Sequence, residues 1–200
     1  LERSNEALKQ FAYAASHDLQ EPVRTMGNYA EILARRYRGR LDADADEFLD
    51  FVVDGAGWMH HLLQGLPEYS RVETPPPVTV PAVMDRALEQ ALGNLGAAIA
   101  NTKASVTSTA LPAVRADDFQ MVQLFQNLVA NAIKFHRPGV PPEVRVDATA
   151  RDSEWVFAVR DNGIGIDLRH AERIFAIFQR LHRRQEYPGT GVGLAICRKI

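Results

Sequence analysis

An apolar stripe with helical period constrains this chain more than any other feature. Between residues 43 and 72, apolar side chains recur at steps of four and three, which is one face of an α-helix. Residues 1–38 carry a similar pattern, and Gly39 with the acidic run at 42–46 marks a turn and a helix start. A single helical hairpin would leave its stripe in water, whereas two paired hairpins cover it. The sequence therefore predicts a hairpin that dimerises into a four-helix bundle, through Phe48, Val52, Ala56, Met59, Leu63 and Leu66.

A run of prolines separates this hairpin from the rest of the chain. Thr74 precedes three consecutive prolines, which end the second helix and predict a stiff linker. Beyond it the pattern mixes helix and strand, which indicates a second domain. Residues 162–190 are poor in regular pattern, as in a disordered segment or a functional lid. We expect strands at 78–80, 104–108, 144–150 and 155–161. We expect one helix at 81–100, a second that begins at a cap formed by Asp117 or Asp118, and a third at 194–200.

The composition of the chain limits which binding partners and which cellular compartment are expected. Hydrophobic residues make up 46% of the chain and charged residues 24%, which is ordinary for a globular protein. A formal net charge of -2 gives no reason to expect a nucleic acid or an anionic membrane as a partner. Cys197 is the one cysteine, so no disulfide can form within the chain, and a cytoplasmic setting is expected. No run of 18 apolar residues occurs, so we expect no direct membrane contact from this segment.

A histidine and a carboxylate are adjacent in the first helical pattern. His17 is followed by Asp18, and Pro22 should bend the helix just past them. A neutral imidazole has a nucleophilic nitrogen, and a carboxylate that holds the other ring proton makes that nitrogen more basic. For two adjacent residues alone, a solvated His–Asp pair on a helix surface is the more common arrangement.

Three further segments contain residues suited to a phosphate ligand. Asn127, Asn131 and Lys134 fall on one helix face, and an amide oxygen is a ligand that suits Mg²⁺. Asparagines also cap helices or form buried amide networks, which is the alternative for this trio. Asp161 precedes Gly163 and Gly165, a pattern that lets a ring approach the backbone or that forms a tight turn. Before the last predicted helix come Gly189, Gly191 and Gly193, where backbone amides can bind phosphate oxygens.

The order and spacing of these four segments resemble the catalytic core of a sensor histidine kinase. The segments match that family's phospho-acceptor H box, N box and two glycine boxes, and Phe175 and Phe178 lie where its F box belongs. The surroundings of His17 look like the subgroup found behind phytochrome-type and PAS-type sensor modules. The resemblance implies an α+β chain: a hairpin forming a dimeric four-helix bundle, then an α/β-sandwich ATP-binding domain of the gyrase, Hsp90 and histidine kinase type. We expect domains at 1–72 and 78–200, a linker at 73–77, and a second domain that lacks the family's closing strands.

The resemblance also implies a reaction and its partners. ATP with Mg²⁺ would phosphorylate His17, assisted by Asp18, and the phosphoryl group would pass to an aspartate on a response-regulator receiver domain. A homodimer and an upstream sensor domain are expected. By family match, Asn131 binds Mg²⁺, Asp161 recognises the adenine amino group, and Arg180 contacts phosphate. The remaining implied nucleotide contacts are Asn127, Lys134, Gly163, Gly165, Gly189, Gly191 and Gly193.

Three other functions remain open at this stage. A non-enzymatic dimeric relay would use the hairpin alone, although the intact ATP-site motifs argue against it. An ATPase of the gyrase and Hsp90 class would need a water-activating glutamate about where Gln123 stands. A phosphatase-dominant kinase would usually carry Thr or Asn four residues after His17, where this chain has Glu21, so that route is not expected here. The histidines interpreted as structural or surface residues are His60, His61, His136 and His170.

Overall fold

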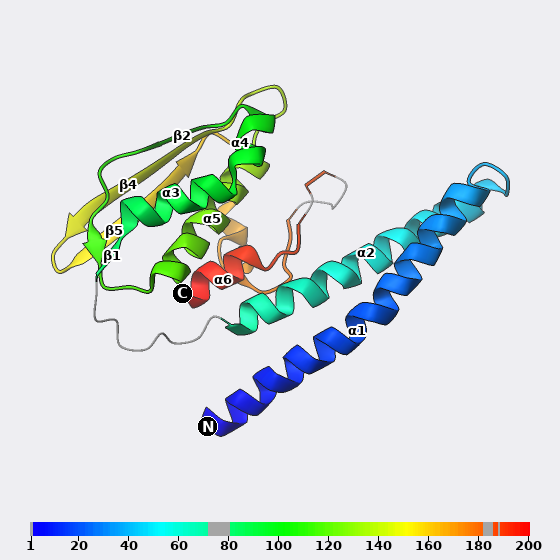
Figure 1. Cartoon of the computed structure of the whole chain (residues 1–200). Helices are drawn as coiled ribbons and strands as arrows, with labels where there is room; N and C mark the ends of the chain where they lie inside the picture. Colours follow the sequence, from blue (N-terminus) through cyan, green and yellow to red (C-terminus); the bar gives the residue numbers. More distant parts are fainter. Residues whose placement is uncertain (1, 72–80, 182–185, 188) are drawn as a thin grey trace. The chain divides into compact units, whose positions relative to one another are not determined.

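The helical hairpin and the mixed domain form two separate units, Leu1–Arg71 and Val72–Ile200. The computed structural model describes residues 2–71, 81–181, 186–187 and 189–200 (Figure 1). The predicted proline linker and the predicted strand at 78–80 lie outside these residues. Within the described ranges, no helix is long and apolar enough to span a membrane.

The hairpin consists of α1 (Glu2–Tyr37) and α2 (Ala43–Arg71). The predicted turn between them is confirmed: Gly39 has φ +70°, and its N–H donates to the Asp46 carboxylate at 2.9 and 3.1 Å. Asp42 starts α2 by accepting from the Ala45 N–H at 2.8 Å. Arg38 and Asp50 form an ion pair at the same end of the hairpin. Local polar contacts therefore close the turn and set where α2 begins.

Small residues let α1 and α2 approach closely. Ala56 of α2 is buried, and a Cβ placed on Gly27 of α1 would lie 3.5 Å from the Ala56 Cβ. Val23, Ala30 and Ala34 are buried in α1 at helical spacing. The predicted stripe was therefore wrong in one respect, because Ala56 packs within the hairpin while Phe48, Val52 and Met59 are exposed. Leu63 is half-buried, and the Leu66 side chain lies outside the described part of the chain.

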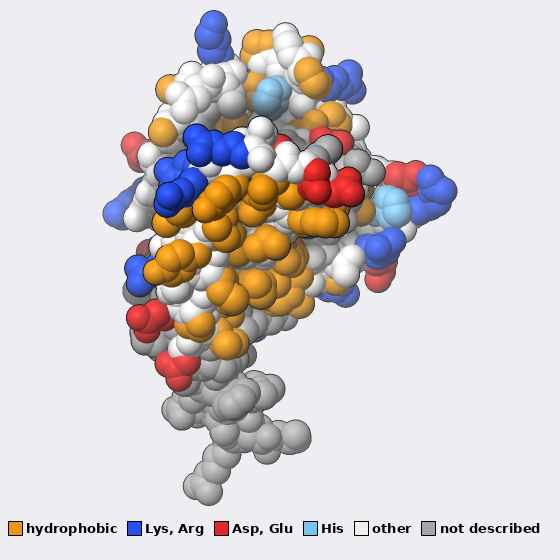
Figure 2. Space-filling model, turned by 90° about the vertical axis from the view of Figure 1, so that its right-hand side faces the viewer, with side chains coloured by type: hydrophobic (Ala, Val, Ile, Leu, Met, Phe, Trp, Pro, Cys, Tyr) orange, Lys and Arg blue, Asp and Glu red, His pale blue; other side chains and the backbone are white. Residues whose placement is uncertain are grey.

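The outward face of the hairpin is strongly apolar. Figure 2 shows one face of the molecule with a broad field of hydrophobic side chains. Phe51 is 67% exposed and Tyr29 is 65% exposed, which is unusual for large side chains on a helix surface. This face fits the prediction of a second copy. Other large exposed residues of the two helices are Leu19, Met26, Ile32, Leu33, Phe48, Val52 and Met59.

The second unit, here called the α/β unit, has a layer of helices over a sheet (Figure 1). The sheet has the order β2-β4-β5, with β2 (Ser105–Ser108) parallel to β4 (Glu143–Arg151) and β5 (Glu154–Asp161) antiparallel to β4. A short antiparallel pair joins β1 (Ala82–Val83) to β3 (Ala113–Val114). The helices are α3 (Met84–Asn94), α4 (Gly96–Thr102), α5 (Asp118–Lys134) and α6 (Gly193–Lys199), with 3-10 turns η1 (Leu168–His170) and η2 (Arg173–Phe175).

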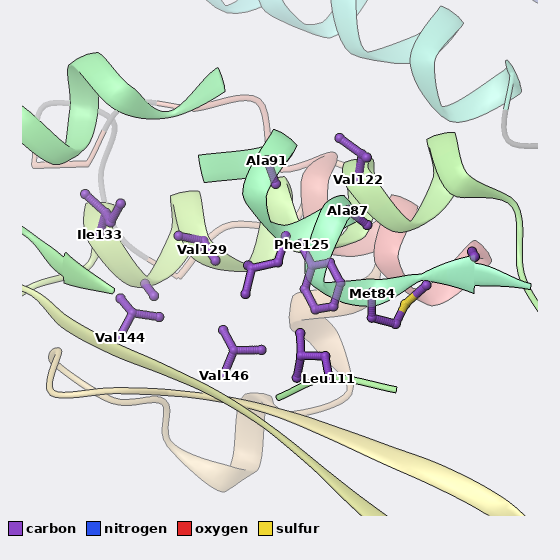
Figure 3. Close-up of a cluster of buried hydrophobic side chains, with 13 residues drawn as sticks. Met84, Ala87, Ala91, Leu111, Val122, Phe125, Val129, Ile133, Val144 and Val146 are labelled. Atoms are coloured by element: carbon purple, nitrogen blue, oxygen red, sulfur yellow. The ribbon is translucent and has the colours of Figure 1, made fainter. Parts of the chain in front are cut away.

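The core of this unit lies between the helices and one face of the sheet (Figure 3). Val144 and Val146 of β4 are buried at alternate positions, as the sheet period requires. Phe125 of α5 is 2% exposed and meets Phe157 of β5 edge to face, with ring centroids 6.2 Å apart. Val129 and Ile133 continue the buried face of α5 one and two turns later.

Two predicted elements differ from the structure. The predicted helix at 81–100 is two helices, because the chain breaks at Leu95 between Gly93 and Gly96. Ala82 and Val83, near the start of that predicted helix, form β1 because they pair with β3. Local helix propensity gives no information about such a distant backbone partner. Asp117, and not Asp118, caps α5 by accepting from the Gln120 N–H at 2.9 Å.

Phe125→Ala should lower the free energy of unfolding of the α/β unit by about 3–5 kcal/mol, because it removes buried area and leaves a cavity. Urea denaturation of a Trp58→Phe background would check this, since Trp155 of β5 then reports on this unit alone. Phe119→Ala is the matched control: Phe119 lies on the same helix but is 75% exposed. The control should change stability by less than about 0.5 kcal/mol. Equal losses in the two variants would contradict the packing described here.

Candidate functional site

The second half of α5 brings the three predicted nucleotide segments together. A Cβ on Gly193 would lie 3.2 Å from Oδ1 of Asn127, and one on Gly189 would lie 3.0 Å from Nζ of Lys134. A Cβ on Gly163 would lie only 2.5 Å from the carbonyl oxygen of Phe135, just past the helix end. Segments that are far away in sequence thus meet one helix.

The loop after β5 is fixed to the end of α5 by backbone contacts. The Gly163 N–H donates to Oδ1 of Asp161 at 2.8 Å, and the Ile164 N–H donates to the Phe135 carbonyl at 3.0 Å. Only glycine fits at 163, because a Cβ there would collide with both the Phe135 carbonyl and the Asp161 carboxylate. These contacts orient the Asp161 carboxylate at the sheet edge.

Arg137 is a contributor that the sequence did not reveal. Its Nε–H donates to the Gly163 carbonyl at 3.0 Å, so Arg137 and Asp161 both contact the backbone of the same loop residue. Arg137 is a single exposed arginine after a helix, and no sequence motif marks such a residue as a contact to a distant loop.

Asn127 has an unsatisfied buried donor. Its Nδ2 is buried and has no hydrogen-bond partner among the described residues. An unpaired buried amide donor costs roughly 1–3 kcal/mol, so it is retained where a ligand supplies the acceptor. A phosphate oxygen is such an acceptor, and Asn127 lies against the glycine segment that leads into α6.

Positive charges are crowded beside this amide. Burial lowers the pKa of Lys134 first of all, and the nearby Arg180 guanidinium lowers it further. The Lys134 ammonium also lies 4.2 Å from the centroid of the Phe135 ring, a cation–π contact that favours the charged form. The net shift of the Lys134 pKa is downward, so burial and the Arg180 charge outweigh the cation–π contact. An anion between Lys134 and Arg180 would relieve this repulsion.

The irregular segment after η2 contacts the end of α5 and the second glycine segment. The Tyr187 ring packs on Phe135 with centroids 5.0 Å apart, and Arg180 donates to the Tyr187 carbonyl. The Phe178 N–H donates to the Gly191 carbonyl at 3.0 Å. Gly191 has φ +72°, and a Cβ there would lie 2.9 Å from the Gln179 carbonyl. The F-box and second glycine segments are thus one folded piece. His182, Arg183 and Arg184 lie outside the described residues.

The donors available for a metal ion are few and neutral. No group of three or more His, Cys, Asp or Glu side chains that could hold a metal occurs among the described residues. Asn131 is half-buried on the site face of α5, between Asn127 and Lys134. One neutral oxygen suits an ion that takes its other ligands from phosphates and water, as Mg²⁺ does.

The His17 segment lies in the other unit. His17 is within α1, but its side chain is not among those the structure describes. Asp18 is exposed next to it, Ser16 is 1% exposed, and Glu21 is exposed one turn later. Among the other histidines, His136 Nδ1 lies 2.8 Å from the Ile133 carbonyl, which is a structural contact.

Comparison with known proteins agrees with both halves of this arrangement. Residues 7–75 match the His Kinase A (phospho-acceptor) domain. Residues 116–200 match the family described as histidine kinase-, DNA gyrase B-, and HSP90-like ATPase. The chain therefore contains the domain pair of a sensor histidine kinase core. Its two domains are the phospho-acceptor and ATP-binding domains of a kinase core.

Phytochromes are among the relatives of this kinase core. The chain is 52% identical over 200 residues to cyanobacterial phytochrome A of a Nostoc species and 48% identical to the phytochrome-like protein Cph1 of a Synechocystis species. It is 34% identical to the methanogenesis regulatory histidine kinase FilI of Methanothrix harundinacea. In each case the match covers the whole chain but only 26%, 27% and 22% of the relative.

Solved structures share the fold. Full-length ShkA, solved in complex with AMPPNP, matches with a TM-score of 0.61 over 95% of this chain and 40% of its own, at 21% identity. The Acinetobacter baumannii histidine kinase AdeS matches with a TM-score of 0.56 over 92% of this chain and 84% of its own, at 19% identity. The predicted fold class is confirmed.

Lys134→Met should stabilise the ligand-free α/β unit and weaken nucleotide binding. Removing the ammonium relieves burial and repulsion from Arg180, and gains of about 0.5–2 kcal/mol are typical of such relief. The loss of a charged contact to phosphate should cost roughly tenfold or more in affinity. Urea denaturation and nucleotide titration calorimetry measure the two effects. Lys103→Met, at an exposed site after α4, should change neither.

The stabilisation by Lys134→Met should depend on pH in a defined direction. Because the folded-state pKa of Lys134 is below its ordinary value of 10.5, the unfolded chain binds more protons between the two values. Wild-type stability therefore gains from this group as pH rises through that window. The advantage of the variant should be largest at neutral pH and shrink toward pH 10.5. An advantage that grows with pH would contradict the crowding argument.

Proposed function

We propose that this chain is the ATP-dependent autokinase core of a two-component signalling protein, with His17 as phospho-acceptor. The observation that carries the proposal is the meeting of the two glycine segments at the second half of α5, in a chain that also bears a His–Asp pair on a separate hairpin. Since the chain spans about a quarter of the length of its phytochrome relatives, the activity is proposed for this core within a longer protein.

The adenosine end of ATP would bind at Asp161 and the glycines of the 161–165 loop. The carboxylate is held by the Gly163 N–H and can accept from an exocyclic amine. The phosphates would bind between the Asn127 amide, the Lys134 ammonium and Arg180, with backbone donors from the segment Gly189 to Gly193. The unsatisfied Asn127 donor and the lowered pKa of Lys134 both support an anion here.

Mg²⁺ would bind through the Asn131 side-chain oxygen and would neutralise charge on the transferring phosphate. Asn131 would hold the ion from α5, and no carboxylate cluster of the described residues would compete for it.

The transfer itself needs a nucleophile more than covalent help from the protein. The free ring nitrogen of His17 attacks the γ-phosphorus, the bond from that phosphorus to the β,γ-bridging oxygen breaks, and ADP leaves. Asp18, exposed beside His17, would hold the proton on the other ring nitrogen and stabilise the charge that develops on the ring. The phosphohistidine would then donate to an aspartate of a receiver domain, under the control of a sensor domain upstream.

His17→Gln should abolish labelling by γ-labelled ATP and Mg²⁺, because no other residue is the proposed acceptor. The wild-type label should be acid-labile and base-stable, as a phosphoramidate is. His60→Gln, on α2 of the same hairpin, is the matched control and should retain the label. A label that persists in His17→Gln would exclude this acceptor. ATP hydrolysis without any protein label would favour the ATPase alternative, and neither hydrolysis nor label would favour a non-enzymatic relay.

Met26→Asp should convert a dimer into monomers, because it places a charge in the apolar face that we propose covers a second hairpin. Met26 is 51% exposed in the single chain. Asn28→Asp introduces the same side chain two residues away, at an exposed polar position, and should leave the dimer intact. Sedimentation velocity at micromolar concentration measures both. Monomeric wild type, or equal dissociation in the two variants, would contradict pairing through this face.

A further inference from the structure

One polar contact crosses the hairpin close to His17. Nε2 of Gln20 in α1 donates to the backbone carbonyl of Leu63 in α2, at 3.3 Å, in a half-buried position. The apolar side chains buried in α1 nearer the turn, Val23, Ala30 and Ala34, make no directional contacts and so permit sliding and rotation. A directional bond among them sets a register.

The Leu63 carbonyl is available because of the residue four positions later. In an α-helix this carbonyl would accept from the N–H of residue 67. Residue 67 is proline, which has no N–H, and it lies inside α2, since the helix continues to Arg71. Gln20 therefore supplies from α1 the donor that Pro67 removes from α2.

Helix α1 also has a proline close to this contact. Pro22, two residues after Gln20, cannot donate to the carbonyl of Asp18. Each helix thus lacks one ladder bond near Gln20. A helix bends most readily at such points, so the turn that carries His17 is the part of α1 whose orientation most needs an outside restraint.

We propose that Gln20 is a positioning residue for phosphorylation: its bond to the Leu63 carbonyl sets the height and rotation of the His17 turn against α2. Gln20 is three residues from His17, so the two share one turn of α1. The reactive ring is presented correctly only while this turn is held. The proposal rests on the proposed function, in which His17 is the acceptor.

A double-mutant cycle between Gln20 and Pro67 tests this directly. Gln20→Glu keeps the side-chain length and helix preference but removes the donor at neutral pH. It should lower kcat of His17 phosphorylation by about three- to tenfold, the effect of one hydrogen bond, and leave the KM for ATP unchanged. Pro67→Ala restores a backbone N–H that can donate to Leu63, so in that background Gln20→Glu should have less than half the effect. Asn28→Asp, on α1 and two turns further from His17, should be neutral in both backgrounds.

The outcomes separate this proposal from the proposed function. A kcat loss that Pro67→Ala rescues supports the positioning role, whereas an equal loss in both backgrounds, or no loss, overturns it. Gln20→Leu repeats the cycle without a charge, and must show the same rescue. If wild type gives no label at His17, the proposed function fails. Amide hydrogen exchange of α2 across the same cycle still tests the bond, and exchange near Leu63 must rise in Gln20→Glu and recover with Pro67→Ala.

Discussion

The structure depends on one helix that serves the core and the site at once. One face of α5 is the centre of the α/β core, where Phe125, Val129 and Ile133 are buried against β4 and β5. The other face carries Asn127, Asn131 and Lys134, and the glycine segments close on it. Because a packed core holds that helix rigidly, the polar face is held to the same precision. Binding residues on a mobile loop would have no such support.

Two local features of this site are energetically unfavourable. Asn127 has a buried donor without an acceptor among the described residues, and Lys134 and Arg180 repel each other in a half-buried setting. Both features are locally unfavourable, and a polyanion bound there would relieve both. Binding sites are where such unfavourable local arrangements persist, since they become favourable only with the ligand present. The close backbone packing at Gly163 and Gly191 belongs to the same design, because it lets the loops reach α5 at all.

The hairpin divides its apolar residues between two tasks. Small residues such as Gly27 and Ala56 let α1 and α2 approach closely, and large ones such as Tyr29 and Phe51 face outward to the surface that we propose a second copy covers. A close interface of small side chains has little directional preference. The Gln20 contact to Leu63 adds direction at the level where both helices carry a proline. Apolar packing thus holds α1 and α2 together, and the Gln20 hydrogen bond sets their register.

The sequence by itself determined the helical hairpin, the turn at Gly39, the antiparallel pair β4 and β5, and the placement of Asn127, Asn131 and Lys134 on one helix. Each of these follows from local chemistry: period, turn residues, capping and the order of motifs. Tertiary structure decided what depends on residues distant in sequence. Pairing with Ala113 and Val114 makes a strand of Ala82 and Val83, and Ala56 turns inward because Gly27 of the other helix leaves room. Arg137 holds Gly163, and Gln20 replaces the donor missing at Pro67, only because folding brings them together. A sequence pattern records what a residue prefers, whereas its partner across the fold decides which preference is met.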